Sequence, residues 1–366
     1  MGKPHGIGII GLGNISRSYL DTLVGIEDVR VVAVADLDPG RAESVADATG
    51  ARALSPEELL ADPAVETVLN LTIPAAHAGI ALAAIAHDKD VYGEKPFAAT
   101  LDEGRQIVAA AAAAGRRAGS APDTVLGTGI QTARSAVDSG LIGRPVSATA
   151  TWVAPGHERW HPNPDFYYRA GGGPLLDMGP YYLTSLVHLL GPIAAVIGRS
   201  SRATSERVIA TGPRAGERFP VEVDTHVVAL LEHASGALSS ITMSFDAVHS
   251  TASFIEVHGE SGSLALPDPN QFDGQTLLWR DAEGEPEALP ERAGFVDSSR
   301  GVGLLDLIRS TPDQERASGA MGMHVLEVML AILESGRTGE RGVIASTVER
   351  PPLVPLTSAE SWRRHA

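Results

Sequence analysis

The sequence predicts an α/β protein in which a doubly wound parallel sheet comes first and a mainly antiparallel sheet follows. Three observations support this. Strand-like runs alternate with helical segments in the first third, a Gly-x-Gly turn links the first run to a helix, and later strand-like runs follow one another with few helices between them. The 366 residues suggest two domains, since about 150 residues per domain is usual. The pattern changes near Pro122, where we expect the boundary.

Short apolar runs in the first third are predicted strands, separated by predicted helices. Val29–Ala35 is rich in β-branched residues, which suits a buried parallel strand. Ser55 and Thr100 each precede a Glu by three residues, which predicts two capping boxes. Gly50 is expected to end the helix before it. The predicted strands are Ile7–Ile10, Val29–Ala35, Thr67–Thr72 and Val91–Gly93, and the predicted helices are Ile15–Val24, Pro39–Thr49, Ala75–His87 and Leu101–Ala114.

Beyond Pro122, several predicted strands alternate polar and apolar residues, as strands with one buried face do. Ala234-Ser235-Gly236 is a predicted hairpin turn. The segment 267–312 is rich in Pro, Gly and charge, and we expect a long surface loop there. The predicted strands are Val146–Val153, Val221–Glu232, Ala237–Phe245, Ser253–Val257 and Ser263–Leu266, and the predicted helices are Thr124–Ser139 and Met323–Glu334.

Charge and composition exclude several partners and chemistries. The net charge of −16 and pI near 5.2 would repel nucleic acid and anionic membranes, so we expect neither as a partner. The chain has no cysteine, which excludes disulfides, thiolate nucleophiles and cysteine metal sites. The apolar stretch from Ile7 leads into a glycine turn and is a strand rather than a signal peptide. No apolar run reaches about 18 residues, so we expect a cytoplasmic protein.

The glycine turn Gly11-Leu12-Gly13-Asn14-Ile15-Ser16 has the features of a dinucleotide-binding loop. Gly11 permits the sharp turn, and Gly13 lets the backbone approach a pyrophosphate. The helix that opens at Asn14 and Ile15 offers free N–H groups and a partial positive charge to it. Ser16 replaces the usual third glycine and is still small. A lone Gly-x-Gly is weak, so its place at the first strand–helix turn carries the prediction.

A carboxylate at the end of the second strand indicates which cofactor would bind. Asp36 can accept hydrogen bonds from an adenosine ribose and would repel a 2′-phosphate, which favours NAD. Arg41 lies nearby and could reach a 2′-phosphate, so NADP stays open. Asp36 could also be only a solvated or loop-capping carboxylate.

Two further stretches complete a family pattern. The first runs from Thr72-Ile73-Pro74 through His77 to Glu94-Lys95-Pro96, and the second is Gly171-Gly172-Gly173-Pro174-Leu175-Leu176-Asp177-Met178-Gly179-Pro180-Tyr181. Together with the glycine turn, they resemble the glucose–fructose oxidoreductase / inositol dehydrogenase / MocA (Gfo/Idh/MocA) oxidoreductases over nearly the whole chain. Glu-Lys-Pro alone is a common string, and its position after a late strand of the first domain makes the resemblance specific.

The resemblance implies a Rossmann NAD(P)-binding domain over residues 1–122. It implies an α/β domain over 123–366, with a large open sheet, for substrate binding and oligomerisation. The partners it implies are a small polyhydroxylated substrate and further copies of the chain, as a homodimer or homotetramer. Pro96 is expected to follow a cis peptide bond. Beside the glycine turn, the resemblance assigns Thr72, Pro74, His77, Glu94 and Lys95 to the cofactor site; His77 could instead be an ordinary residue at a helix start.

In this family the substrate site contains the Lys of Glu-Lys-Pro and the Asp and His of the later motif. Lys95 and Asp177 match, whereas Tyr181 stands at the His position and Thr184 at that of a usual second Asp. The tyrosine resembles branches, glucose–fructose oxidoreductase among them, in which Tyr is the acid/base. We therefore name Lys95, Asp177 and Tyr181 as the catalytic candidates.

These residue types suit the oxidation of an alcohol. Tyr181 could exchange the hydroxyl proton if its pKa fell from about 10 towards neutrality, and the Lys95 ammonium would favour that. Asp177 and Tyr181 are four residues apart and would share one face of a helix. Pro180 would fit the first turn of that helix and limit its upstream extent. The alternatives are a surface lysine at Lys95, a helix N-cap at Asp177 and a packed aromatic at Tyr181.

A cluster of aromatic and His residues precedes the glycine run. His157, Trp160 and Tyr168 are candidates for the substrate pocket, because aromatic faces stack on the CH groups of sugars. A purely structural loop is an equal alternative. A metal site from His157, His161 and Asp165 is conceivable by residue type, but we expect no metal, since the family's chemistry needs none.

Three function classes remain open. The first is an NAD(P)-dependent dehydrogenase or reductase acting on a sugar, sugar derivative or cyclitol. The second is an NAD-retaining enzyme that cleaves glycosides by transient oxidation. The third is a non-catalytic NAD(P)-binding sensor, which the presence of Lys95, Asp177 and Tyr181 disfavours.

Overall fold

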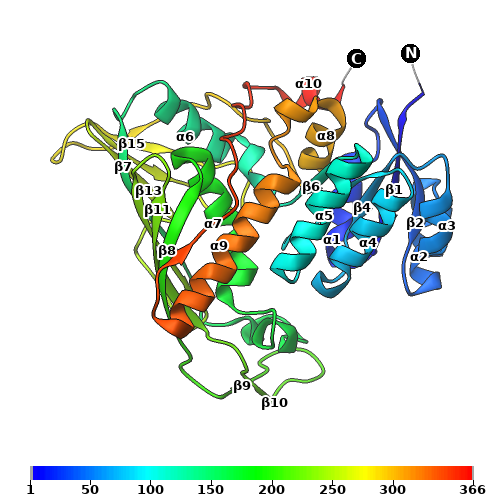
Figure 1. Ribbon diagram of the computed structural model, residues 1–366, viewed down its shortest axis with the longest axis horizontal. Helices are drawn as coiled ribbons and strands as arrows, with labels where there is room; N and C mark the ends of the chain where they lie inside the picture. The colour runs from blue at the N-terminus through cyan, green and yellow to red at the C-terminus, as the bar shows by residue number, and fades with distance from the viewer. Residues whose placement is uncertain (1–2, 365–366) are drawn as a thin grey trace. The chain divides into compact units, whose positions relative to one another are not determined.

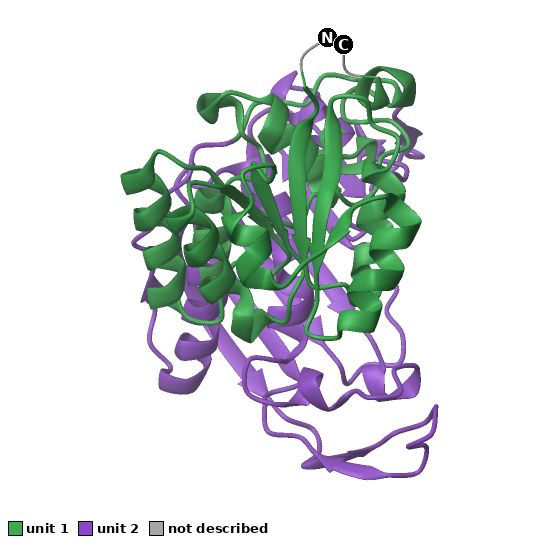
Figure 2. Cartoon of the chain, turned by 90° about the vertical axis from the view of Figure 1, so that its right-hand side faces the viewer, with its two compact units in different colours: residues 1–131, 291–326, 351–366 green, residues 132–290, 327–350 purple. Residues whose placement is uncertain are grey.

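The chain passes more than once between two structural units. The computed structural model describes residues 3–364. One unit contains residues 1–131, 291–326 and 351–366, and the other contains residues 132–290 and 327–350 (Figure 2). Helices α6 (Thr128–Asp138) and α9 (Gly319–Thr338) contribute residues to both units. The domain boundary at residue 122 stays a prediction.

The first unit is built on a six-stranded parallel sheet with the order β3-β2-β1-β4-β5-β6 (Figure 1). Because the strand order reverses direction beside β1, the carboxyl ends of β1 and β4 flank a crevice of the kind in which ligands bind in such sheets. The fold class predicted for this region is confirmed. The strands are β1 His5–Ile10, β2 Val29–Ala35, β3 Arg52–Ala53, β4 Thr67–Asn70, β5 Asp90–Gly93 and β6 Ala118–Ser120.

The helices of the first unit begin and end where local capping signals stand. Ser55 and Thr100 both form the predicted capping boxes, and Gly50 ends its helix in the left-handed region at φ 72°. Asp38 caps the N-terminus of that same helix by accepting from two backbone N–H groups. The helices are α1 Asn14–Leu23, α2 Pro39–Thr49, α3 Pro56–Ala61, α4 Pro74–Ala86, α5 Leu101–Ala114, α8 Val302–Arg309 and α10 Ala359–Arg363, with 3₁₀ turns at Thr124–Leu126 and Pro312–Gln314.

The two late segments of the chain are tied into the first unit by hydrogen bonds. Trp362 is buried, its indole N–H donates to the Val296 carbonyl, and the Arg309 guanidinium donates to the Trp362 carbonyl. Arg309 also pairs with Asp28, which lies just before β2. The first unit is therefore completed by residues close to the C-terminus.

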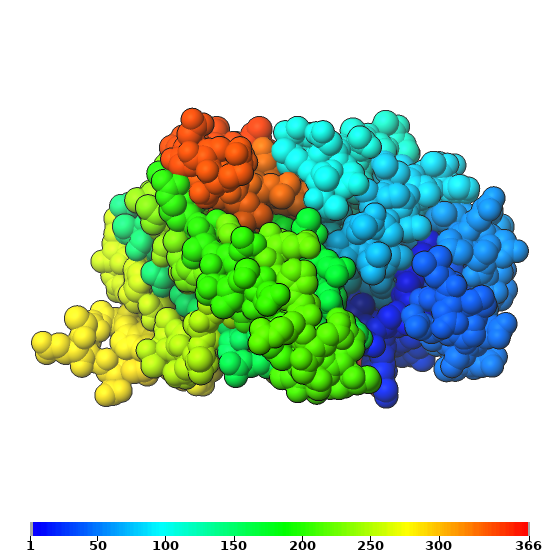
Figure 3. Space-filling model, turned by 90° about the horizontal axis from the view of Figure 1, so that it is seen from below, coloured from blue at the N-terminus to red at the C-terminus, as the bar shows by residue number. Residues whose placement is uncertain are grey.

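The second unit is built on a nine-stranded sheet with the order β16-β15-β14-β13-β7-β12-β11-β8-β17. Every neighbouring pair is antiparallel except β7 and β12, so the predicted mostly antiparallel sheet is confirmed. The hairpin that contains β16 projects from this unit (yellow in Figure 3). The strands are β7 Pro145–Val153, β8 Ile193–Ser201, β11 His226–His233, β12 Leu238–Ser244, β13 Ile255–Gly259, β14 Ser263–Leu266, β15 Leu277–Trp279, β16 Glu287–Ala288 and β17 Gly342–Val343. A separate pair consists of β9 Glu206–Val208 and β10 Arg218–Pro220.

The two faces of the large sheet differ. Helix α7 (Pro174–Leu190) packs on β7, β11 and β12, and alternate side chains of β11 are buried. The opposite face exposes apolar side chains. Leu230 of β11 is 60% exposed and lies opposite Ile197 of β8, which is 43% exposed. This open face agrees with the sheet that the family resemblance implied.

Several predicted elements need correction. Helix α7 begins six residues before Pro180, because Leu175 and Met178 continue its buried side and outweigh the one hydrogen bond that Pro180 removes. The predicted helix Thr124–Ser139 is a 3₁₀ turn followed by α6. The predicted strand Val221–Glu232 starts only at His226, and the strands β8 and β17 were not predicted. The expected loop 267–312 contains β15, β16 and α8.

None of the helices in residues 3–364 combines the length and the apolar character that crossing a membrane requires.

Candidate functional site

The glycine turn forms the start of α1 in the way the sequence predicted. Gly11 has φ 94°, and a Cβ there would lie 2.7 Å from the Leu71 carbonyl, so only glycine fits between β1 and the chain after β4. Gly13 is the N-cap of α1, no side chain caps the helix, and the position of its absent Cβ is open to 4 Å. Ser16 donates to the Gly13 carbonyl at 2.7 Å. The first N–H groups of α1, at Asn14 and Ile15, thus stand at an unblocked helix N-terminus that fits a pyrophosphate.

Asp36 is held next to this turn. Its carboxylate accepts from the Leu12 N–H at 2.7 Å and from the Asp38 N–H at 2.9 Å. Burial raises the pKa of Asp36, but these two N–H groups and the nearby Arg41 guanidinium outweigh burial and hold the pKa below its ordinary value. Arg41 lies 3.5 Å from the same carboxylate. A fixed negative charge therefore marks the end of β2.

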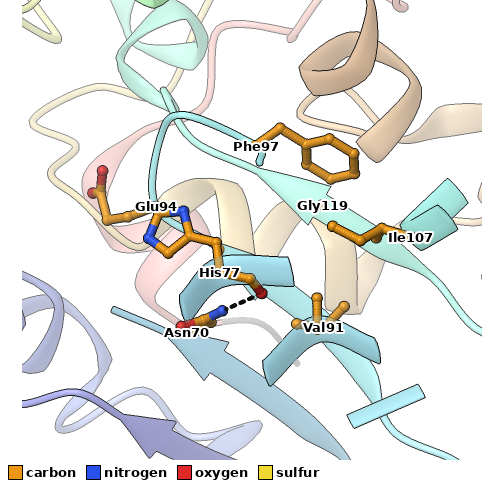
Figure 4. Close-up of a pocket in the computed structure, with 9 residues that line it drawn as sticks. Asn70, His77, Val91, Glu94, Phe97, Ile107 and Gly119 are labelled. Carbon is orange, nitrogen blue, oxygen red and sulfur yellow. Dashed lines mark hydrogen bonds between the residues drawn. The ribbon is translucent and has the colours of Figure 1, made fainter. Parts of the chain in front are cut away.

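The turn after β4 is fixed by a set of hydrogen bonds around His77. Asn70 accepts from the Thr72 hydroxyl at 2.6 Å and donates to the His77 carbonyl at 3.0 Å (dashed in Figure 4). The ring of His77 is buried, with Nδ1 2.7 Å from the Pro96 carbonyl and Nε2 3.0 Å from the Thr72 carbonyl. Pro74 is the first residue of α4. His77 thus joins two segments that both carry candidate site residues.

The Glu94-Lys95-Pro96 segment follows β5. Glu94 is buried, accepts from the Tyr19 hydroxyl of α1 at 2.8 Å, and accepts from the Lys95 backbone N–H at 3.0 Å. The Lys95–Pro96 peptide bond is cis, as expected. Glu94 also borders a small cavity with His77 (Figure 4). Its carboxylate orients this segment against α1.

In the second unit, Asp177 lies in the first turn of α7 and is bonded to a histidine. Asp177 Oδ2 is 2.8 Å from Nε2 of His157, which is buried in a 3₁₀ turn (His157–Arg159). The indole N–H of Trp160 donates to Nδ1 of His157 at 3.1 Å. An indole N–H can only donate, so Nδ1 is an acceptor and the ring proton is on Nε2, directed at the carboxylate. The chain of bonds runs Trp160 to His157 to Asp177.

Tyr181 follows Asp177 by one turn on α7, as predicted, and is 95% buried, with 5% of its surface exposed. The next residue, Tyr182, is fully buried, and its hydroxyl has no hydrogen-bond partner within residues 3–364. Burial raises the pKa of Tyr182, and the Asp268 carboxylate raises it further. Tyr182 is therefore a matched comparison for Tyr181.

Tyr168 packs in the core of the second unit, in place of the substrate contact expected for it. Its side chain is fully buried, its hydroxyl donates to Glu158, and it accepts from the His157 backbone N–H at 3.0 Å. Burial raises the pKa of this tyrosine, and the hydrogen bond to Glu158 adds to the shift. Glu158 also pairs with Arg207 at 2.7 Å, and Arg207 pairs with Asp246. This network holds the His157 turn against β9 and the end of β12.

Several of these supporting residues were not predicted from the sequence. Asn70 could have been found from the sequence, because it is a polar residue at the end of an apolar strand. Tyr19, Glu158 and Arg207 gave no such signal, because their partners are distant in sequence. Asp165, a conceivable metal ligand by residue type, pairs with Arg214 at 2.6 Å. Within the described residues no three His, Asp or Glu side chains are placed to hold a metal ion.

Comparison with known proteins agrees with this geometry. Residues 5–121 match the oxidoreductase family with an NAD-binding Rossmann fold, and residues 130–265 match the GFO/IDH/MocA C-terminal domain. A 1,5-anhydro-D-fructose reductase of Ensifer adhaerens is 28% identical over 92% of this chain and 98% of its own length. An inositol 2-dehydrogenase of Pseudomonas fluorescens is 31% identical over 72% of this chain and 75% of its own.

A solved structure of levoglucosan dehydrogenase with NADH superimposes with a TM-score of 0.78 over 94% of this chain and all of its own, at 19% identity. That likeness shows the fold. The sequence relatives and the two matched domains show more: the chain belongs to the GFO/IDH/MocA family of NAD-binding oxidoreductases.

Proposed function

We propose that this protein is an NAD-dependent dehydrogenase or reductase that transfers a hydride between a nicotinamide and a hydroxyl or keto carbon of a sugar, sugar derivative or cyclitol. The observation that carries the proposal is the open N-terminus of α1 beside the fixed charge of Asp36. Relatives named for anhydrofructose and inositol support the substrate class.

Residues of the first unit would hold the cofactor. The N–H groups of Asn14 and Ile15 at the start of α1 suit the pyrophosphate, and Asp36 suits a ribose with free hydroxyls. Arg41 is engaged with Asp36, and the fixed Asp36 carboxylate would repel a 2′-phosphate. We therefore propose NAD over NADP. When bound, the nicotinamide supplies or accepts the hydride.

The remaining chemistry is proton transfer and charge stabilisation. Tyr181 is proposed to exchange the proton of the substrate hydroxyl, and Lys95 to stabilise the negative charge that develops on that oxygen. Asp177 is proposed to hold a substrate hydroxyl. The His157 N–H directed at Asp177 fixes the orientation of that carboxylate.

The test is a screen of sugars and cyclitols for a change in NAD(P)H absorbance, followed by variants at the proposed acid/base. Tyr181→Phe should lower kcat by about 100-fold or more, because general acid–base catalysis contributes that much. Tyr182→Phe is the control and should keep kcat, since its hydroxyl makes no hydrogen bond in residues 3–364. Near-normal turnover by Tyr181→Phe would refute the proposed role.

We also propose that copies of the chain associate through the open face of the large sheet. Leu230 and Ile197 expose neighbouring apolar side chains on it, and such a strip is more stable when a second copy covers it.

A further inference from the structure

Aromatic side chains gather around the His157 turn. Phe, Trp and Tyr make up only 5% of the chain, yet residues 160–167 contain three of them close to His157 and His161. Trp160 is 58% exposed and Phe166 is 56% exposed. Large aromatic rings that stay this exposed in one place usually contact a ligand or partner.

The exposed rings have rigid supports. Phe166 belongs to a 3₁₀ turn (Asp165–Tyr168) that Asp165 anchors through its pair with Arg214. The next residue but one, Tyr168, is locked into the buried network described above. Trp160 is held by its indole N–H bond to His157. A surface whose rotamers are fixed before binding loses little conformational entropy when a ligand stacks on it.

Neighbouring rings of this cluster are set edge to face. The ring centroids of Trp160 and His161 are 5.3 Å apart with their planes at 79°, and those of His161 and Phe166 are 5.4 Å apart with their planes at 83°. The two exposed rings, Trp160 and Phe166, thus both contact His161, and each is open to a ligand ring.

The same surface connects to the proposed substrate carboxylate. The bonds from Trp160 to His157 and from His157 to Asp177 measure 3.1 Å and 2.8 Å. The imidazole thus separates the indole from the carboxylate, so a ring stacked on Trp160 and a hydroxyl held by Asp177 belong to different parts of a ligand. A ligand with two linked rings can use both contacts.

We propose that Trp160 and Phe166 form a stacking subsite for a second ring, so that the substrate is a glycoside such as a disaccharide or a glycosylated cyclitol. This rests on the proposed function, in which Asp177 holds the ring that is oxidised. The stacked ring presents its CH face to the aromatic side chains and contributes affinity without taking part in hydride transfer.

The test compares one-ring and two-ring ligands on the full-length protein. Calorimetric affinities and kcat/KM are measured for D-glucose, myo-inositol, cellobiose, maltose and galactinol. At least one two-ring ligand should bind 10-fold or more tightly than its one-ring parent. Trp160→Ala and Phe166→Ala should each reduce that ratio at least fivefold. Phe254→Ala is the matched control, since Phe254 is 41% exposed and absent from the aromatic cluster; it should leave the ratio within twofold.

Trp160→Phe separates the two contributions of Trp160. It keeps an aromatic face and loses the N–H bond to His157, so the two-ring preference should remain while kcat falls for every substrate. If no two-ring ligand binds better than its parent, or if both alanine variants keep the wild-type ratio, the subsite is refuted while hydride transfer can stand. Tight two-ring binding without any hydride transfer would instead refute the proposed function alone.

Discussion

Replacing Asp123 by Asn should stabilise the first unit at neutral pH. Asp123 is fully buried, and its Oδ2 accepts from the N–H groups of Gly301 and Gly303 at 2.7 and 3.1 Å, at the start of α8. Its Oδ1 has no hydrogen-bond partner within residues 3–364. Asn keeps an oxygen for both N–H groups and places a neutral amide where the second carboxylate oxygen lies.

The magnitude follows from the pKa of this carboxyl group. Burial raises the pKa of Asp123 to about 6, although Arg300 and the two N–H groups oppose the shift. The unfolded chain titrates at about 3.9, so the folded state binds the proton more tightly by about two pKa units, or about 3 kcal/mol. The contribution of Asp123 to the unfolding free energy should therefore be greatest below about pH 4, fall by about 3 kcal/mol as the pH rises to about 6, and change little above that.

The assay is the unfolding free energy, or Tm, of wild type and Asp123→Asn between pH 4 and 8. The unfolding free energy of the variant should increase relative to that of the wild type as the pH rises through this window, because Asp123 ionises there and Asn does not. Asp47→Asn, at an exposed position of α2, is the control and should show a difference of about 0.5 kcal/mol or less. A difference between wild type and Asp123→Asn that stays flat with pH would refute the reasoning, as would a net loss of stability at pH 7.

The other variants address the cofactor, the carboxylate and the open sheet. Asp36→Ser should raise the ratio of kcat/KM for NADPH to that for NADH at least 10-fold. An unchanged ratio would show that Asp36 does not determine the preference between the two cofactors. Gly11→Ala should cost about 2 kcal/mol of unfolding free energy and weaken NADH binding in fluorescence titration, because its Cβ would collide with the Leu71 carbonyl. His157→Asn should lower kcat about 10-fold with little change in Tm. A large fall in Tm together with the loss of kcat would instead indicate that His157 has only a structural role. Leu230→Glu should lower the molar mass measured by light scattering towards that of the monomer. An unchanged molar mass would show that the open face of the large sheet is not the interface between copies.

Much of the first unit could be predicted because its signals are local. A capping box spans four residues, and the Ser55 and Thr100 boxes both form as their sequences indicate. The glycine turn is equally short, and its backbone is what the spacing of Gly11 and Gly13 requires. Such features need no knowledge of the distant chain.

Contacts between distant residues could not be predicted in the same way. The bond between His157 and Asp177 spans 20 residues, and that between Glu158 and Arg207 spans 49. Nothing in either segment indicates its partner, since many His and Arg residues are equally placed by sequence. The course of α7 through Pro180 was missed for a related reason: burial along the whole helix outweighs a local signal against it.

The C-terminal residues that complete the first unit affect the order in which the chain can fold on the ribosome. The strands of the parallel sheet emerge before the second unit, whereas Trp362, which contacts Val296 and Arg309, emerges after it. The parallel sheet therefore lacks these contacts while the second unit is synthesised. Protease resistance of the first unit should reach its final level only when Trp362 has left the ribosome.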